Sequence, residues 1–172
     1  MKFAIIAAVD SKMGIGKAGT LPWRLKGDMD HFREITTKEW ALGKQNAVIM
    51  GRTTWLSLPE RHRPLPGRIN IILSGEPVAL PQGVERATTF DSALQAAAAQ
   101  NPGKIFIIGG GSVYAQGIVR PECGELFLTR VQGDFECDVK FPEVPSIYKL
   151  TSTSEPVQEG SINYVYETYA RT

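Results

Sequence analysis

The chain has 172 residues, of which 42% are hydrophobic and 22% charged, so it is long enough for one domain with a buried core and short for two. Its formal net charge of +1 gives no reason to expect nucleic acid or an anionic membrane as partner. Two cysteines and two histidines are too few for a disulfide framework or for a cysteine–histidine metal site.

The first apolar run, Phe3–Val9, follows a single basic residue, Lys2. It is at the lower length limit of a signal-peptide core, and it continues into Asp10 without a small-residue cleavage site. A strand buried on both faces is therefore the better interpretation. No stretch approaches the roughly 20 apolar residues of a membrane span. We expect a cytoplasmic protein that contains no metal.

Residues 13–36 combine a glycine-rich loop with a helical segment, and the helical segment has one apolar stripe. Asp28 falls on this stripe, where an unpaired carboxylate is costly unless it finds a partner or becomes protonated. An acid in the first helical turn, or a rotated face that leaves it in water, explains the position equally well. The stripe consists of Leu25, Met29, Phe32 and Ile35.

Strand and helix patterns alternate through the rest of the chain. This order predicts an α/β fold, a single domain over residues 1–172 with a mostly parallel central β-sheet, flanking helices and an antiparallel C-terminal edge strand. Strands are predicted at Asn46–Met50, Ile69–Leu73, Lys104–Ile108, Leu126–Val131, Tyr148–Ser152 and Asn163–Ala170, and helices at Phe90–Gln100 and Ser112–Val119.

Three of these strands end in small or hydroxyl residues, and ligands of open α/β sheets bind beyond the carboxyl ends of the strands. Residues 109–112, Gly-Gly-Gly-Ser, place backbone amides and a helix start where they meet phosphate oxygens. Residues 50–54 offer a second helix start with Arg52, which is suited to an additional phosphate. Two such starts suggest a dinucleotide. A tight strand-to-helix turn explains the glycines almost as well, because Tyr114 replaces the third glycine of G-x-G-x-x-G.

Six blocks of the sequence, in order and over nearly the whole chain, resemble the dihydrofolate reductase family. They are Met13–Lys17 with Leu21-Pro22-Trp23, Asp28 and Phe32; Val48–Trp55; Arg63–Asn70; Ile107–Tyr114; Leu126–Thr129; and Asp138–Pro142. The resemblance implies the reduction of 7,8-dihydrofolate to 5,6,7,8-tetrahydrofolate by hydride transfer from NADPH. A monomer is the usual case in this family and antifolate inhibitors are plausible ligands, but the oligomeric state and the antifolate sensitivity of this chain stay open.

The resemblance further implies roles for individual residues. Asp28 would accept hydrogen bonds from the pterin, with the Thr129 hydroxyl as its partner. Trp23 would hold the water that delivers a proton, and Leu21 would close over it. Arg68 would bind the glutamate α-carboxylate of the substrate. The other substrate-contacting residues that the family implies are Ile6, Ala8, Met29, Phe32, Leu58, Leu65, Ile108 and Tyr114.

The family also implies a cofactor site with a cis peptide bond between Gly109 and Gly110. Ser112 stands where some bacterial members have an arginine, so the strength of the preference for NADPH over NADH stays open. The implied cofactor-binding residues are Ala8, Ile15, Gly16, Gly51, Arg52, Thr53, Thr54, Leu73, Ser74, Gly75, Ile108, Gly109, Gly110, Gly111, Ser112 and Val113.

Two other functions stay open. A pyrimidine reductase of riboflavin synthesis shares this fold and cofactor, but it should lack Arg68 and the pairing of Trp23 with Asp28. A non-catalytic NADPH-binding relative predicts that the substitution Asp28→Asn changes nothing.

Overall fold

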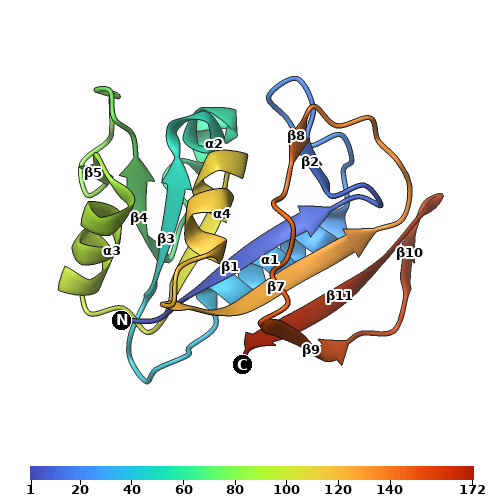
Figure 1. The fold of residues 1–172 in the computed structure, drawn as a ribbon. Coiled ribbons are helices and arrows are strands. Elements are labelled where there is room, and N and C mark those ends of the chain that lie inside the picture. The colour runs from blue at the N-terminus through green and yellow to red at the C-terminus, as the bar shows by residue number, and fades with distance from the viewer.

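Six parallel strands form the centre of the molecule in a computed structural model that describes all 172 residues (Figure 1). Their order across the sheet is β7-β1-β6-β3-β4-β5, and the antiparallel strand β11 (Ile162–Arg171) follows at the edge next to β7. The six strands are β1 (Phe3–Val9), β3 (Asn46–Gly51), β4 (Arg68–Leu73), β5 (Glu85–Ala87), β6 (Ile105–Gly109) and β7 (Cys123–Val131). The fold class predicted from the sequence is confirmed.

The remaining elements extend or cover this sheet. Strands β9 (Tyr148–Thr153) and β10 (Val157–Glu159) both pair with β11, and β2 (Gly14–Gly16) pairs separately with β8 (Val139–Lys140). The helices are α1 (Lys26–Thr37), α2 (Arg52–Ser57), α3 (Phe90–Ala99) and α4 (Gly111–Ile118), and a short 3-10 helix covers Glu60–His62. None of the helices combines the length and the hydropathy that crossing a membrane requires.

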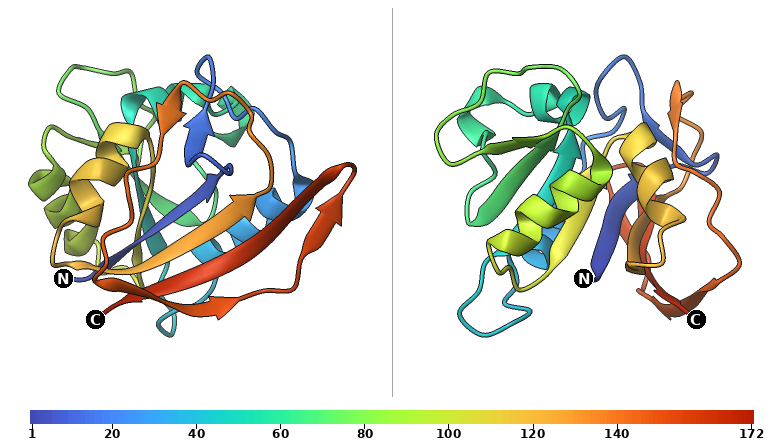
Figure 2. Two further views of the ribbon diagram at one scale, coloured as in Figure 1. Left: turned by 45° about the vertical axis from the view of Figure 1, so that its right-hand side comes forward. Right: turned by 60° about the vertical axis from the view of Figure 1, so that its left-hand side comes forward.

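Alternate residues of each central strand belong to two cores on opposite faces of the sheet. On β1, Ile5 packs in the core beneath α3 and α4, whereas Ile6 packs in the core beneath α1 and α2. Figure 2 shows these helices on the two faces. Both faces of the strands are buried, and this explains why their sequences are continuous apolar runs.

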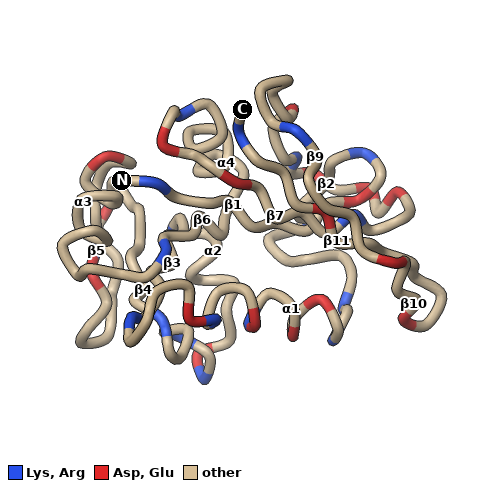
Figure 3. Tube along the Cα trace, turned by 90° about the horizontal axis from the view of Figure 1, so that it is seen from below, with Lys and Arg blue, Asp and Glu red and all other residues tan.

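Charged residues of both signs are interspersed along the chain, and helix α1 itself carries both (Figure 3). The predicted apolar stripe of this helix is wrong at one position. Met29 has 58% of its surface exposed, while Thr36 is fully buried and donates a hydrogen bond to the Phe32 carbonyl at 2.8 Å. The helix is rotated so that Asp28, Phe32 and Thr36, spaced four residues apart, lie toward the sheet.

Asp10, at the end of β1, organises the loop that follows. It is 2% exposed, and its Oδ1 accepts hydrogen bonds from the N–H groups of Lys12 at 2.8 Å and Gly14 at 2.7 Å. Its Oδ2 accepts from the N–H of Phe135 at 3.0 Å. Burial raises the pKa of Asp10, but these backbone donors together with the Cys137 thiol outweigh it, so the pKa lies below its ordinary value.

The substitution Asp10→Asn is expected to lower the free energy of unfolding by about 2 kcal/mol at pH 7, because an amide turns its NH₂ group toward N–H donors. The lowered pKa means that the ionised form stabilises the fold above about pH 4, and that this contribution is lost as the pH falls through the folded-state pKa. Urea unfolding should therefore show a difference in the free energy of unfolding between wild type and variant, and this gap should narrow at acidic pH. A gap of constant size would contradict this assignment.

Candidate functional site

Asp28 lies in the first turn of α1 and is half-buried against the sheet. Thr129 of β7, itself only 4% exposed, donates a hydrogen bond from its Oγ1 to the Asp28 Oδ1 at 2.7 Å. Burial raises the pKa of Asp28, the Thr129 bond lowers it in part, and the negative charge of Glu159 raises it further. The structure thus gives this carboxylate a hydrogen-bond partner and also places it in the first helical turn, so both of these explanations hold, whereas the fully solvated position is not observed.

Trp23 and Leu21 lie before this helix in contrasting environments. Trp23 is 6% exposed and its ring packs edge-on against Phe135 with centroids 5.2 Å apart, whereas Leu21 is 54% exposed. The indole N–H of Trp23 is buried and has no hydrogen-bond partner in the protein. Such groups are rare in folded proteins, and this one favours a bound water or ligand atom as its acceptor.

Arg68 is the first residue of β4 and is only 8% exposed. Its Nε donates to the Pro66 carbonyl at 2.9 Å and its Nη1 to the Thr36 hydroxyl at 3.0 Å. Burial lowers the pKa of Arg68, and the neighbouring charge of Arg33 lowers it further. Because both hydrogen-bond partners are uncharged, the guanidinium keeps its affinity for an external carboxylate.

The predicted apolar wall is only partly assembled on one face. Five of its members belong to one core cluster, and Ala8 packs beside Trp23 in a neighbouring cluster. Met29 is exposed, and Tyr114 packs in the opposite core, where its hydroxyl donates to the Ile6 carbonyl at 2.8 Å. The structure therefore does not bring Met29 and Tyr114 together with the others, and their substrate contacts stay predictions. The five clustered residues are Ile6, Phe32, Leu58, Leu65 and Ile108.

Most of the predicted cofactor residues lie at the carboxyl ends of β6, β3 and β4, the edge where α2 and the β2–β8 pair also lie (Figure 1). Of the others, Ile15 and Gly16 lie on β2 and Ala8 lies within β1. Gly109 is the cross-strand partner of Met50, and Leu73 is that of Gly51. The Gly109–Gly110 peptide bond is cis, as the family resemblance implies. Helix α4 starts directly after this bond, and no side chain caps its N-terminus.

The predicted cofactor residues around this edge differ in their exposure and in whether their side chains already have partners. Arg52 is exposed and forms an ion pair with Glu76 at 3.9 Å, whereas the Ser74 hydroxyl already donates to the Glu76 carbonyl at 2.7 Å. A Cβ on Gly111 would lie 2.9 Å from Val139 and 3.9 Å from Ile15, so β2 and β8 pack against the glycine turn. Thr53, Gly75 and Ser112 are exposed, Gly16, Thr54 and Gly110 half-buried, and Val113 buried.

Sequence reasoning missed the residues that hold the start of α1. Glu159 and Tyr166 contact this turn from the C-terminal hairpin, and both are more than 130 residues away in the chain. The only local signal is the turn glycine Gly160, with φ of 61°, which indicates a hairpin but not what that hairpin contacts.

Together these groups suit a specific kind of ligand. A carboxylate with a raised pKa accepts hydrogen bonds from a nitrogen heterocycle, and a buried guanidinium binds an acidic tail. An uncapped helix N-terminus at a strand end binds phosphate. No group of three His, Cys, Asp or Glu side chains is placed to hold a metal ion.

Comparisons with known proteins agree with this geometry. A family model described as dihydrofolate reductase matches residues 2–171. The dihydrofolate reductase of Rattus norvegicus is 42% identical over 96% of this chain and 95% of its own length, and that of Aedes albopictus is 38% identical over 99% and 97%. The bifunctional dihydrofolate reductase-thymidylate synthase 1 of Arabidopsis thaliana is 36% identical over 98% of this chain, which spans only 34% of that relative.

Proposed function

The chain belongs to the dihydrofolate reductase family, and we propose that it reduces 7,8-dihydrofolate to 5,6,7,8-tetrahydrofolate with NADPH as the hydride donor. The observation that carries the proposal is Asp28. It is a half-buried carboxylate with a raised pKa, held by Thr129, and a carboxylate of this kind can accept hydrogen bonds from a pterin. We propose that the protein acts in the cytoplasm as a monomer and that antifolate inhibitors are plausible ligands.

The residues at the carboxyl ends of β3, β4 and β6 fit NADPH. The free N–H groups at the start of α4 suit the pyrophosphate, and the exposed guanidinium of Arg52 suits the additional phosphate that distinguishes NADPH from NADH. When bound, NADPH supplies the hydride, and the chain aligns the two ring faces between which it passes.

On the substrate side the chain orients the pterin and manages a proton. Asp28 accepts hydrogen bonds from the pterin amino group and the adjacent ring nitrogen, and Thr129 holds the carboxylate in place. The unpartnered indole N–H of Trp23 holds the water that delivers the proton, with Leu21 of the glycine-rich loop closing over it. Arg68 binds the glutamate α-carboxylate.

The direct test is the loss of NADPH absorbance when purified protein is mixed with dihydrofolate. Turnover that requires dihydrofolate supports the proposal. NADPH binding without turnover contradicts it, and turnover with the pyrimidine substrate of riboflavin synthesis instead would favour the second reductase class.

The substitution Arg52→Ala is expected to raise KM for NADPH by about tenfold and to leave KM for NADH unchanged. A charge-assisted contact to the additional phosphate is worth about 1.5 kcal/mol or more, and NADH has no such phosphate. Steady-state kinetics with both cofactors measures the effect. Lys149→Ala, which removes an exposed cation from the distant strand β9, is the control. An equal loss with NADPH and NADH would contradict the assignment of Arg52.

A further inference from the structure

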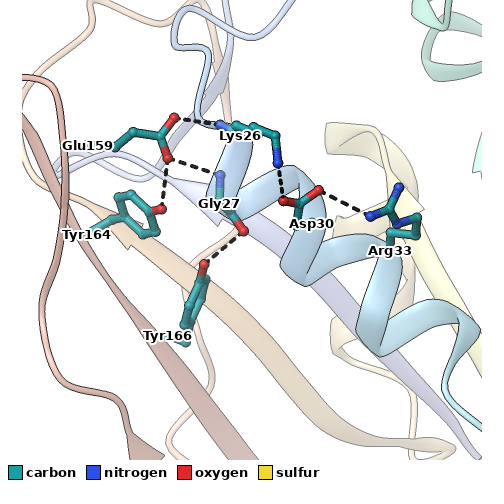
Figure 4. Close-up of polar contacts among 7 residues, drawn as sticks. All are labelled: Lys26, Gly27, Asp30, Arg33, Glu159, Tyr164 and Tyr166. Carbon is teal, nitrogen blue, oxygen red and sulfur yellow. Dashed lines mark hydrogen bonds and ion pairs between the residues drawn. The ribbon is translucent and has the colours of Figure 1, made fainter.

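The first turn of α1 is held by the C-terminal hairpin rather than by its own sequence. The residue before the helix, Leu25, makes no side-chain cap. Glu159 of β10 takes this place, because its Oε2 accepts from the N–H of Lys26 at 2.6 Å and its Oε1 from the N–H of Gly27 at 3.0 Å (Figure 4). A carboxylate in this position satisfies two orphan donors and complements the positive end of the helix dipole.

Two tyrosines of β11 complete this contact, which we call the hairpin clamp: Glu159, Tyr164 and Tyr166. Tyr164 donates to the Glu159 Oε1 at 3.2 Å, and Tyr166 donates to the Gly27 carbonyl at 3.2 Å (Figure 4). The Tyr166 ring also stacks on His31 of α1 with centroids 3.7 Å apart. Position 27 requires glycine for this approach, because a Cβ there would overlap the Tyr164 hydroxyl.

The clamp acts on the backbone that carries Asp28, the residue directly after Gly27. Thr129 holds the Asp28 side chain from β7, while Glu159 holds the preceding two backbone amides from β10. The carboxylate is thus located by its own hydrogen bond and by the position of its helical turn. Loss of the clamp removes the second of these constraints and keeps the bond to Thr129.

We propose that Glu159 is a positioning residue for Asp28: by holding the two backbone amides that precede it, Glu159 sets the place of this carboxylate in the site. The proposal rests on the proposed function for its kinetic consequence, but the coupling between the two carboxylates is a property of the ligand-free chain. Glu159 bonds to the backbone of α1 and to the Tyr164 hydroxyl, so its effect on the reaction passes through Asp28.

The charged and titratable groups around Asp28 determine the sign of the electrostatic effect. From β10 and β11 these are Glu159, Tyr164 and Tyr166, and from α1 itself His31. Burial lowers the pKa of His31 and raises that of both tyrosines, so near neutral pH Glu159 is the charged member. Its negative charge raises the pKa of Asp28, and neutralising position 159 should therefore lower the pKa of Asp28.

The first test is an NMR titration of the Asp28 carboxyl carbon without any ligand, in wild type, Glu159→Gln and Glu159→Ala. Both variants remove the charge, so both should lower the pKa of Asp28. Glu159→Gln keeps one acceptor oxygen for the helix amides, so this variant can be measured if the Glu159→Ala protein does not fold. An Asp28 pKa that stays at the wild-type value would overturn the proposal.

The second test is a double-mutant cycle on the turnover of dihydrofolate with NADPH. Glu159→Gln is expected to lower kcat/KM by about fivefold and Glu159→Ala by more. A loss of this size corresponds to the typical free-energy cost of losing a helix cap. Both losses should vanish in the Asp28→Asn background, because the clamp acts through Asp28. Losses of unchanged size in that background would overturn the proposal.

Asp30→Asn is the matched control, because Asp30 is an exposed carboxylate of the same helix that pairs with Lys26 and Arg33 and accepts no backbone amide (Figure 4). It should leave kcat/KM near the wild-type value. Failure of the proposed function is distinguishable from failure of this inference. An absence of dihydrofolate turnover in wild type refutes the former, and an unshifted NMR titration refutes the latter.

Discussion

The substitution Asp28→Asn is expected to lower kcat/KM for dihydrofolate by about 100-fold or more. This loss is within the range of rate losses caused by removing a group that assists proton transfer. Asparagine has nearly the same shape, and its amide oxygen can still accept the hydrogen bond from Thr129. However, it carries no negative charge and turns an NH₂ group toward donors of the pterin. Stopped-flow and steady-state measurements of NADPH oxidation give the size of the loss.

The same variant carries a second readout that does not depend on activity. Because the pKa of Asp28 is raised in the folded state, its stabilising contribution is present below the unfolded-state pKa and is lost as the pH rises through the folded-state pKa. Above the folded-state pKa, the half-buried carboxylate therefore opposes folding. Urea unfolding at pH 7 should find Asp28→Asn at least as stable as wild type. A variant that is clearly less stable and fully active would refute the role of Asp28.

Replacement of Arg68 is the second change with a large expected effect. Arg68→Leu should raise KM for dihydrofolate by about 100-fold with a much smaller change in kcat. Losing one partner of a buried charge pair costs about 2–5 kcal/mol, and the guanidinium is far from the chemistry in this assignment. The KM of Arg68→Lys for dihydrofolate should lie between those of wild type and Arg68→Leu, at about ten times the wild-type value. The reason is that an ammonium cannot form the two parallel hydrogen bonds of a guanidinium.

A substrate without the acidic tail separates binding from folding in these variants. Arg68 also donates to Thr36 and Pro66, so its loss disturbs the start of β4 as well as the ligand contact. A dihydropterin that lacks the glutamate should be reduced at nearly the same kcat/KM by wild type and by Arg68→Leu. An equal loss with both substrates would show that Arg68 supports the fold and does not bind the carboxylate. Thermal unfolding confirms that the variant is folded.

Some features of this protein are encoded locally in its sequence. The continuous apolar run of Phe3–Val9 predicts a strand buried on both faces, and the structure places β1 between β6 and β7. The glycines at 109–111 predict a strand-to-helix turn, and α4 begins there. Short strands such as β2 and β8 are invisible in the sequence, because two or three residues carry no period and their pairing joins distant segments.

The sequence by itself determined the α/β class, the edge of the sheet where the glycine turn lies, and the singular position of Asp28, because periodicity and turn chemistry are properties of neighbouring residues. Only the tertiary structure decided what surrounds that carboxylate. Thr129 reaches it from 101 residues away and Glu159 reaches its helical turn from 133, while the rotation of α1 exposes Met29 and buries Thr36. Contacts of this kind arise from the packing of whole elements, where many weak interactions are summed and no local pattern records the result.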